Sequence, residues 1–218
     1  MYRDHALRDD EIAFSTDEAT GLQALERIAA DRPMAPGKPL AREFEYRRHG
    51  TQTVIAALNV KTGEVHARCG DTRTEEDFAD FIDQLIDTHS AYRVHHIVLD
   101  QLNTHKSEAL VRMVARRCGI QDDLGVKGRC GILATMESRA AFLERADKAI
   151  VFHYTPKHAS WMNQIEIWFG ILGRKVLRRG NFPSKSALRE GINDFVDYFN
   201  KTMAKPFKWT FQGKVLEA

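Results

Sequence analysis

The sequence predicts an α/β fold in which helices pack on one mixed β-sheet. Five runs rich in apolar and β-branched residues are typical of strands, at residues 12–16, 51–60, 64–69, 94–99 and 149–154. Elsewhere apolar residues recur every three or four positions, which is the period of a helix. A tight turn joins the second and third runs, and a helical segment separates the third from the fourth. This order favours a mixed sheet with helices packed on it.

Length and composition are those of an ordinary globular domain. The 218 residues can bury a sizeable core, and 43% hydrophobic with 28% charged residues is unexceptional. No apolar run approaches the ~20 residues of a membrane span, and the start, M-Y-R-D-H-A-L-R-D-D, lacks the apolar centre of a signal peptide. Three cysteines without a C-x-x-C pair indicate free thiols in a reducing cytosol. Because the net charge is only +2, any polyanion site must be local.

The first fifty residues predict a strand, a short helix and a loop. The strand at 12–16 ends at Asp17, and residues 22–28 then show a brief helical spacing. A proline-rich stretch forces a loop after them. Residues 42–49, R-E-F-E-Y-R-R-H, are basic with two aromatics, and they fit a solvated loop or edge strand as well as a surface for a nucleic-acid backbone.

The next segments predict a hairpin and a capped helix. The glycine of the turn K-T-G joins the strands 51–60 and 64–69. Thr74, with Asp77 three residues later, fits a capping box at a helix start. The inner face of this helix is apolar and consists of Phe78, Phe81, Ile82, Leu85 and Ile86.

The second half continues with a strand at 94–99 and a helix over 107–118. Residues 119–148 are punctuated by glycines and contain one segment, 137–145, that could be helical. The fifth strand follows and leads into the most distinctive stretch of the chain.

That stretch predicts a helix that starts soon after the fifth strand. Pro156 ends the strand, and Ser160 or Asn163 can cap the helix. Its apolar stripe consists of Ile165, Phe169, Leu172 and Val176, and Gly170 and Gly173 should leave the face of Glu166 open. Ser184 caps a final helix, and the aromatic tail at 206–211 is expected to pack back on the domain.

Three acids stand where strands end or a helix begins. Asp17 follows the first strand, Asp100 ends the fourth, and Glu166 begins the helix after the fifth. Ligands gather at such positions, and carboxylates are the preferred ligands of Mg²⁺. Two ions ~3.5–4 Å apart can activate water and stabilise the leaving oxygen of a phosphodiester. Aspartates at strand ends are also common in turns and caps, so position alone leaves a structural role open.

Other polar and aromatic residues near the acids have ordinary interpretations. We expect His105 and His158 to form hydrogen bonds in loops rather than to bind metal. Trp161 and Trp168 flank Glu166 and favour packing, with base stacking as the alternative. Candidates for contact with nucleic-acid phosphates are Arg47, Arg48, Lys157, Arg174, Lys175, Arg178 and Arg179, with Lys106 a weaker one.

Three phrases resemble the catalytic blocks of DDE transposases. They are F-S-T-D-E at 14–18, V-L-D-Q-L-N-T-H-K at 98–106 and Y-T-P-K-H-A-S-W-M-N-Q-I-E-I-W-F at 154–169. The resemblance is to the mariner-like superfamily, and within it to the bacterial insertion-sequence branch. It covers nearly the whole chain and implies a ribonuclease H-like fold, with a central mixed five-stranded sheet and helices on both faces.

The resemblance also implies an activity. Asp17, Asp100 and Glu166 would bind two Mg²⁺ ions, with Mn²⁺ as a substitute, for DNA strand cleavage and strand transfer in transposition and integration. The expected partners are the terminal repeats of the element and target DNA, with a homodimer as a further expectation and no membrane. The expected location is the bacterial cytoplasm, at the nucleoid when the protein acts.

The sequence departs from the family pattern in three places. Gln101 stands where Asn is usual; we expect Gln101 and Asn163 to contact the acids rather than the metal. The spacing from Asp100 to Glu166 is about twice that of many mariner-like members, and we assign the excess to an insertion at about 119–148. Complete members carry helix-turn-helix domains ahead of the catalytic domain. Residues 1–218 are therefore expected to be a single catalytic domain without that region.

Two alternatives remain open from the sequence. One is a ribonuclease H-like nuclease of another substrate class, such as RNA in a hybrid or a DNA junction. The other is a truncated, inactive remnant that only binds DNA or full-length transposase.

Overall fold

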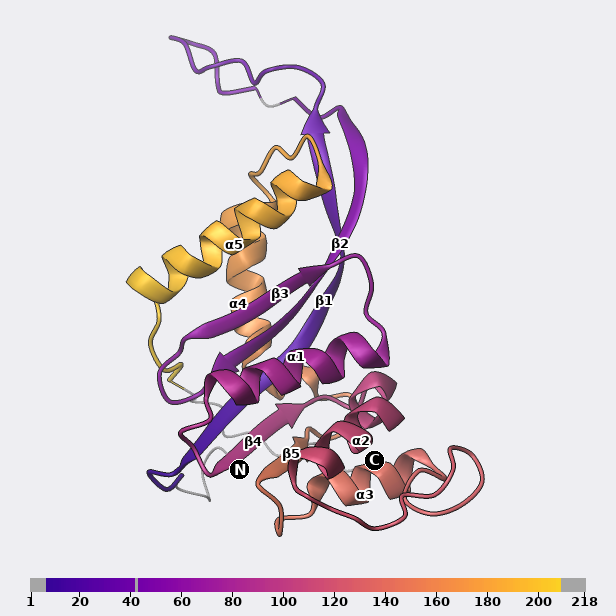
Figure 1. The fold of residues 1–218 in the computed structure, drawn as a ribbon. Coiled ribbons are helices and arrows are strands. Elements are labelled where there is room, and N and C mark those ends of the chain that lie inside the picture. Colours follow the sequence, from indigo (N-terminus) through magenta and orange to yellow (C-terminus); the bar gives the residue numbers. More distant parts are fainter. Residues whose placement is uncertain (1–6, 42, 209–218) are drawn as a thin grey trace.

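A computed structural model describes residues 7–41 and 43–208 and shows one five-stranded sheet with helices on both faces (Figure 1). The strands are β1 (Glu11–Arg27), β2 (Tyr46–Asn59), β3 (Val65–Gly70), β4 (Val94–Leu99) and β5 (Ile150–Tyr154). The helices are α1 (Glu75–Thr88), α2 (Glu108–Arg117), α3 (Met136–Glu144), α4 (Ile165–Leu172) and α5 (Lys185–Thr202). Three short turns complete the set: the 3₁₀ turns η1 (Asn103–Lys106) and η2 (Ser160–Met162), and the π-helical turn η3 (Gly173–Leu177).

The sheet is mixed, as predicted. Its strand order is β3-β2-β1-β4-β5, with β2 antiparallel to β1 and β3, and with β4 parallel to β1 and β5. In the parallel pair, Ser15 of β1 lies opposite Val98 of β4. Asp17 and Asp100 each follow two residues later, so the register brings both to the same level at the end of β4.

Two apolar layers cover the two faces of the sheet. Successive side chains of a strand point to opposite faces, and in β2 the residues Ile55 and Ala57 belong to one core while Val54, Ala56 and Leu58 belong to the other. Helices α1, α2 and α3 pack on the first face. Helices α4 and α5 pack on the second. The site described below lies where these layers meet the ends of β4 and β5.

Two predicted helix caps, at Thr74 and Ser184, are present, and Ser107 supplies a further cap. Thr74 and Asp77 form the capping box of α1, with the backbone N–H of Asp77 donating to Thr74 Oγ1 at 3.2 Å. The predicted inner face of α1 is buried. Ser107 and Ser184 cap α2 and α5 through their side chains. The hairpin of β2 and β3 and the helix within 119–148 are confirmed as well.

Strand β1 is much longer than predicted, which corrects two expectations. Asp17 lies inside the strand and does not follow it, and residues 22–28 are not helical because β1 continues to Arg27. Register shifts between Ala19 and Leu22 and between Gln23 and Leu25 interrupt the pairing with β2. Such bulges break the two-residue alternation of a strand. As a result, the apolar residues of 22–28 are spaced three residues apart, which resembles the period of a helix.

The far ends of β1 and β2 form a two-stranded arm that extends from the body of the sheet (Figure 1). Residues 46–49, which the sequence allowed to be either a loop or an edge strand, belong to strand β2. Arg42 lies outside the described residues. The proline-rich loop predicted after residue 28 connects the two strands. Large apolar side chains are exposed on this arm, at Ile28, Met34, Leu40, Phe44 and Tyr46.

The start of α4 differs from the prediction. Neither Ser160 nor Asn163 caps the helix; Gln164 occupies the cap position without a side-chain hydrogen bond. Trp168, rather than Phe169, is the buried aromatic between Ile165 and Leu172.

The two glycines toward the end of α4 differ in the space around them. A Cβ at Gly170 would lie 3.3 Å from Arg174 Nη1, whereas a Cβ at Gly173 would meet nothing within 4 Å, as predicted.

The remaining features concern loops, thiols and the tail. Gly125 has a φ of +82°, and a Cβ there would lie 2.1 Å from the carbonyl oxygen of Cys130, so this turn requires glycine. All three cysteines are free thiols. Phe207 packs on the α4–α5 core, whereas the tail residues Trp209 and Phe211 lie outside the described residues. Among the described helices, none is long and apolar enough to cross a membrane.

Candidate active site

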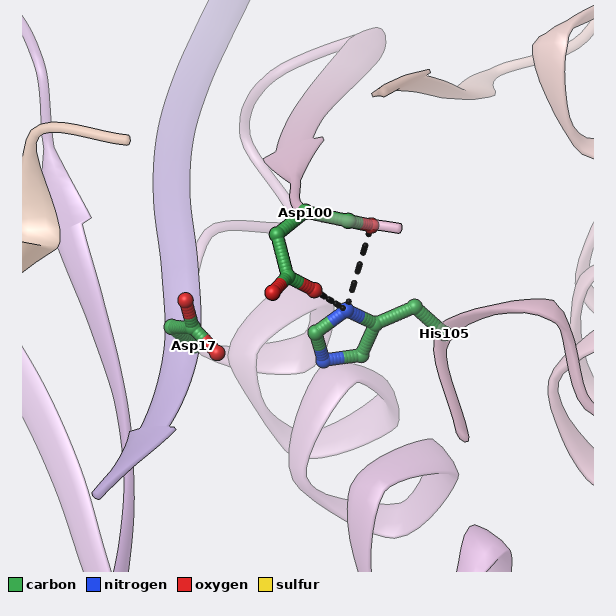
Figure 2. Close-up of side chains that lie close together, drawn as sticks. All are labelled: Asp17, Asp100 and His105. Carbon is green, nitrogen blue, oxygen red and sulfur yellow. Dashed lines mark hydrogen bonds and ion pairs between the residues drawn. The ribbon is translucent and has the colours of Figure 1, made fainter. Parts of the chain in front are cut away.

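Asp17 and Asp100 face each other at the level where β4 ends (Figure 2). Asp17 lies in β1 and is 5% exposed, while Asp100 follows the last residue of β4 and is half-buried. A carboxylate oxygen of each, together with one ring nitrogen of His105, lies within 4.8 Å of the other two atoms. Two of the three predicted acids are thus brought together by the register of the parallel strands.

The pKa of Asp17 is raised to about 7 from an ordinary 3.8. Burial is the largest cause, because a buried carboxyl group loses the hydration that stabilises its charge. The negative charge of Asp100 raises the pKa further. A cation bound between Asp17 and Asp100 would offset the negative charge of the two carboxylates.

Asn163 links Asp17 to the start of α4. Its Nδ2 donates to the backbone oxygen of Thr16 at 2.8 Å and to Asp17 Oδ2 at 3.3 Å. Its Oδ1 accepts from the Ser15 hydroxyl, which in turn accepts from the N–H of Ile165 at 2.9 Å. Asn163 therefore contacts a predicted acid, and its partner Ser15 joins Ile165, the residue before Glu166, to β1.

Glu166 is the second residue of α4 and is exposed. Its pKa is raised, first by partial burial and then by the charge of Asp100. Within residues 7–41 and 43–208, the compact cluster contains Asp17, Asp100 and His105 but not Glu166. The contribution of Asp100 to this raised pKa is the described link between Glu166 and the cluster.

His105 is fully buried, and both of its ring nitrogens lie 2.8 Å from carboxylate oxygens. Nδ1 contacts Asp100 Oδ1 and Nε2 contacts Glu18 Oε2. Burial alone would lower the pKa of His105, but the hydrogen bonds to Asp100 and Glu18 outweigh it and raise the pKa to about 9. The sequence pattern predicts a loop position for His105 and indicates no role for Glu18. The sequence signal for this pair is that His105 stands five residues after Asp100, and Glu18 stands directly after Asp17.

The turn that carries His105 is held from two further elements. Arg139 of α3 donates from Nε to the backbone oxygen of Lys106 at 2.6 Å and from Nη1 to that of Leu133 at 2.8 Å. The Tyr154 hydroxyl of β5 donates to the backbone oxygen of His105 at 2.7 Å. Arg139 is buried. Its role could not be predicted from the sequence, because its partners are backbone oxygens of other segments.

Gln101 contacts neighbouring segments, and no described contact joins it to an acid side chain. Its Nε2 donates to the backbone oxygen of Thr155 at 2.6 Å, and its Oε1 accepts from Lys106. Lys106 also lies over the ring of Tyr154, at 4.9 Å from the centroid. These contacts tie the ends of β4 and β5 together beside a cavity of about 280 Å³ lined by Asp100, Gln101, Leu102, Thr155, Pro156, His158 and Ser160.

Lys106, the weaker candidate for phosphate contact, is half-buried and hydrogen-bonded to Gln101, whereas the other predicted residues are exposed and occupy two separate regions. Arg174, Lys175, Arg178 and Arg179 lie in and just after η3, beyond Glu166, and Lys157 lies in the loop after β5. Arg47 and Arg48 lie on the arm, where Arg47 is 3.8 Å from Glu26 and Arg48 lies over the Tyr46 ring.

The two tryptophans that flank Glu166 have different environments. Trp168 is fully buried between α4 and α5, which confirms its packing role. Trp161 is 49% exposed and is accessible to a ligand.

Comparison with known proteins supplies a family and a fold. The family model described as "DDE superfamily endonuclease" matches residues 14–189. No curated protein matches the chain.

Two of the similar solved structures are of Mos1 transposase. The structure titled "Mos1 transposase paired-end complex with left transposon end" is 9% identical, with a TM-score of 0.53, covering 90% of this chain and 50% of that chain. The "Mos1 Strand Transfer Complex" is 11% identical, with a TM-score of 0.49, covering 90% and 49%. This chain thus spans about half the length of those proteins. The first likeness confirms the predicted ribonuclease H-like fold.

Proposed function

The chain belongs to the DDE superfamily endonucleases, and from this premise we propose that it is the catalytic domain of a mariner-like transposase. It cleaves DNA strands at the ends of its element and transfers them to target DNA. The observation that carries the proposal is the convergence of Asp17 and Asp100 at the end of β4, with Glu166 electrostatically coupled to Asp100 at the head of α4.

The residues that would hold divalent cations are Asp17, Asp100 and Glu166. The donor set fits Mg²⁺, with Mn²⁺ as a substitute, because it offers carboxylate oxygens, and burial followed by the charge of Asp100 raises the pKa of Asp17. Two bound ions would activate the attacking oxygen and stabilise the leaving oxygen of a phosphodiester. Asn163 orients Asp17, and Ser15, which donates to Asn163, holds the N–H of Ile165 at the head of α4, on which Glu166 lies. The exposed basic residues in and after η3 hold the phosphates of the DNA backbone.

The same proposal includes a dimer that pairs two DNA ends. Its support is the arm, which exposes large apolar side chains, including Phe44 at 82% and Met34 at 75%. Exposed apolar patches mark interaction sites, and a second copy of this chain is the partner that a paired-end complex requires. Sedimentation of wild type and of Met34→Ser/Phe44→Ser should show a dimer that dissociates in the variant. A monomeric wild type with DNA bound would exclude this arrangement.

The extent and origin of the domain are part of the proposal. We propose that residues 1–218 belong to a single catalytic domain with an insertion at about 119–148; the family model matches residues 14–189 of it. The element is of the bacterial insertion-sequence type, and the protein acts on DNA at the nucleoid.

Nicking of supercoiled plasmid DNA tests the activity. Wild type should nick the plasmid with Mg²⁺ or Mn²⁺ and not with chelator, and Glu166→Ala and Asp100→Ala should each abolish nicking while keeping the far-UV circular dichroism of wild type. Asp147→Ala, which removes an exposed carboxylate paired with Arg145 ahead of β5, is the matched control and should keep activity. Full nicking by Asp100→Ala would refute the proposal, and an inert wild type that still binds DNA would instead support a remnant.

A further inference from the structure

Each ring nitrogen of His105 faces a different carboxylate. The imidazole lies between two carboxylates, with Asp100 on its Nδ1 side and Glu18 on its Nε2 side. The side chains of His105 and Glu18 are 0% and 1% exposed. A buried glutamate that meets a buried histidine is stabilised only by such a pairing, because an unpaired buried charge is costly. The Glu18–His105–Asp100 chain is therefore one unit.

This unit fixes one oxygen of Asp100 and leaves the other available. Asp100 Oδ1 accepts from the backbone N–H of Leu102 at 2.9 Å and contacts His105 Nδ1 at 2.8 Å. Among the described contacts, no hydrogen bond reaches Oδ2. The carboxylate is thereby held in one orientation before any cation arrives, with Oδ2 as its free ligand atom.

His105 is itself held by its surroundings. The Thr104 hydroxyl contacts Glu18 Oε1 at 3.4 Å, and the His105 ring packs on Phe78 with centroids 4.6 Å apart. Tyr154 and Arg139 bind the backbone oxygens of His105 and Lys106. The ring therefore has little freedom to turn away from Asp100.

We propose that His105 is a positioning residue for the metal-binding carboxylate of Asp100, with Glu18 as its anchor. This inference rests on the proposed function. The imidazole is not a metal ligand in this arrangement, because each of its two nitrogens faces a carboxylate oxygen at 2.8 Å rather than an open position for a cation. Outer-shell partners that orient ligands in this way typically contribute about 10–100-fold in metal affinity.

Two conservative variants separate the two halves of the unit. In His105→Asn the side-chain nitrogen stands near the place of Nδ1, so the donor to Asp100 is kept. In His105→Gln the nitrogen stands near the place of Nε2, so only the donor to Glu18 is kept. If His105 only filled space in the core, the larger Gln would replace it better than Asn. If His105 positions Asp100, Asn is the better replacement.

Titration of the metal-free chain with Mn²⁺, followed by electron paramagnetic resonance, gives the readout without DNA or turnover. We expect His105→Gln to weaken Mn²⁺ binding about 10–100-fold and His105→Asn to weaken it clearly less. Glu18→Ala should weaken binding in the same direction as His105→Gln. His49→Gln removes a second histidine–glutamate pair, that of His49 and Glu26 on the arm, and should keep wild-type affinity.

Thermal unfolding of each variant shows whether it is folded at the temperature of the titration. Equal Mn²⁺ affinity of folded His105→Gln and wild type would overturn the positioning role. Direct coupling of bound Mn²⁺ to an imidazole nitrogen in wild type would also overturn it and make His105 a ligand. If Asp100→Ala also binds Mn²⁺ as wild type does, the proposed metal centre itself fails. Loss of binding in Asp100→Ala with no effect of His105→Gln removes only this inference.

Discussion

Asp17 is held in a form that resists ionisation, and this has a consequence for stability. Its native pKa of about 7 lies above its ordinary value of 3.8, so between these pH values the native chain binds more protons than the unfolded chain. Stability from this group is complete below pH ~4 and is lost as the pH rises through about 7. The metal-free protein should therefore carry a destabilising charge at neutral pH that a cation would offset.

The substitution Asp17→Asn tests this directly. It should leave the free energy of unfolding of the metal-free protein unchanged near pH 4, and raise it by up to about 4 kcal/mol at pH 8, since one pKa unit corresponds to about 1.36 kcal/mol. Urea unfolding with chelator present, at both pH values, is the measurement. An equal difference at pH 4 and pH 8 would show that charge is not the cause.

At the scale of elements, the join between β1 and α4 sets the geometry of the site. Asn163 and Ser15 stand in place of the expected cap: Ser15 Oγ accepts from the N–H of Ile165 and donates to Asn163 Oδ1, and Asn163 Nδ2 contacts Asp17. A cap would have stabilised the helix alone. The observed join instead transmits the position of β1 to the residue before Glu166.

Asn163→Ala should therefore affect both stability and activity. We expect a loss of about 1–3 kcal/mol in unfolding free energy, because buried hydrogen-bonding groups lose their partner, and a fall in nicking rate of about 10-fold or more. Asn200 is a matched control, since its side chain binds both the N–H and the C=O of Val65 at the edge of the sheet. Asn200→Ala should lose similar stability and keep its nicking rate. A parallel loss of rate in both variants would mean that destabilisation explains the effect.

Much of the element map could be predicted because its signals are local. The capping box of α1, the glycine turn of the hairpin and the strand that ends before Asp100 each depend on a few neighbouring residues. The length of β1 could not be predicted, because bulges disguised its period and pairing with β2 decided its structure. The link from Glu18 to His105 and the anchor at Arg139 join segments far apart in the chain, which no local pattern records.

At the scale of the whole molecule, charge is distributed so that DNA binding depends on local clusters. The net charge is only +2, and the basic residues of η3 lie beyond Glu166. Contacts to phosphates give affinity without sequence information. We therefore expect weak, salt-sensitive and sequence-indifferent binding by this chain, with a Kd of ~10⁻⁴–10⁻⁶ M.

Arg178→Gln/Arg179→Gln should weaken binding to terminal-repeat and scrambled duplexes equally and flatten the salt dependence by up to ~2 units of slope. Arg112→Gln/Arg116→Gln on α2 is the matched control, because these exposed arginines pair with Glu108 and Asp83 on the opposite face of the sheet. Fluorescence anisotropy at several salt concentrations gives both slopes. A preference above ~100-fold for the terminal repeat would mean that this domain reads bases itself.

The central claim is that Asp17, Asp100 and Glu166 together form one divalent-metal centre. Anomalous diffraction from crystals of the chain grown with Mn²⁺ tests it most directly. The account predicts two manganese peaks about 3.5–4 Å apart, with ligand oxygens from all three acids and none from His105. Manganese bound only by Asp17, Asp100 and His105, with Glu166 outside ligand distance, would contradict it.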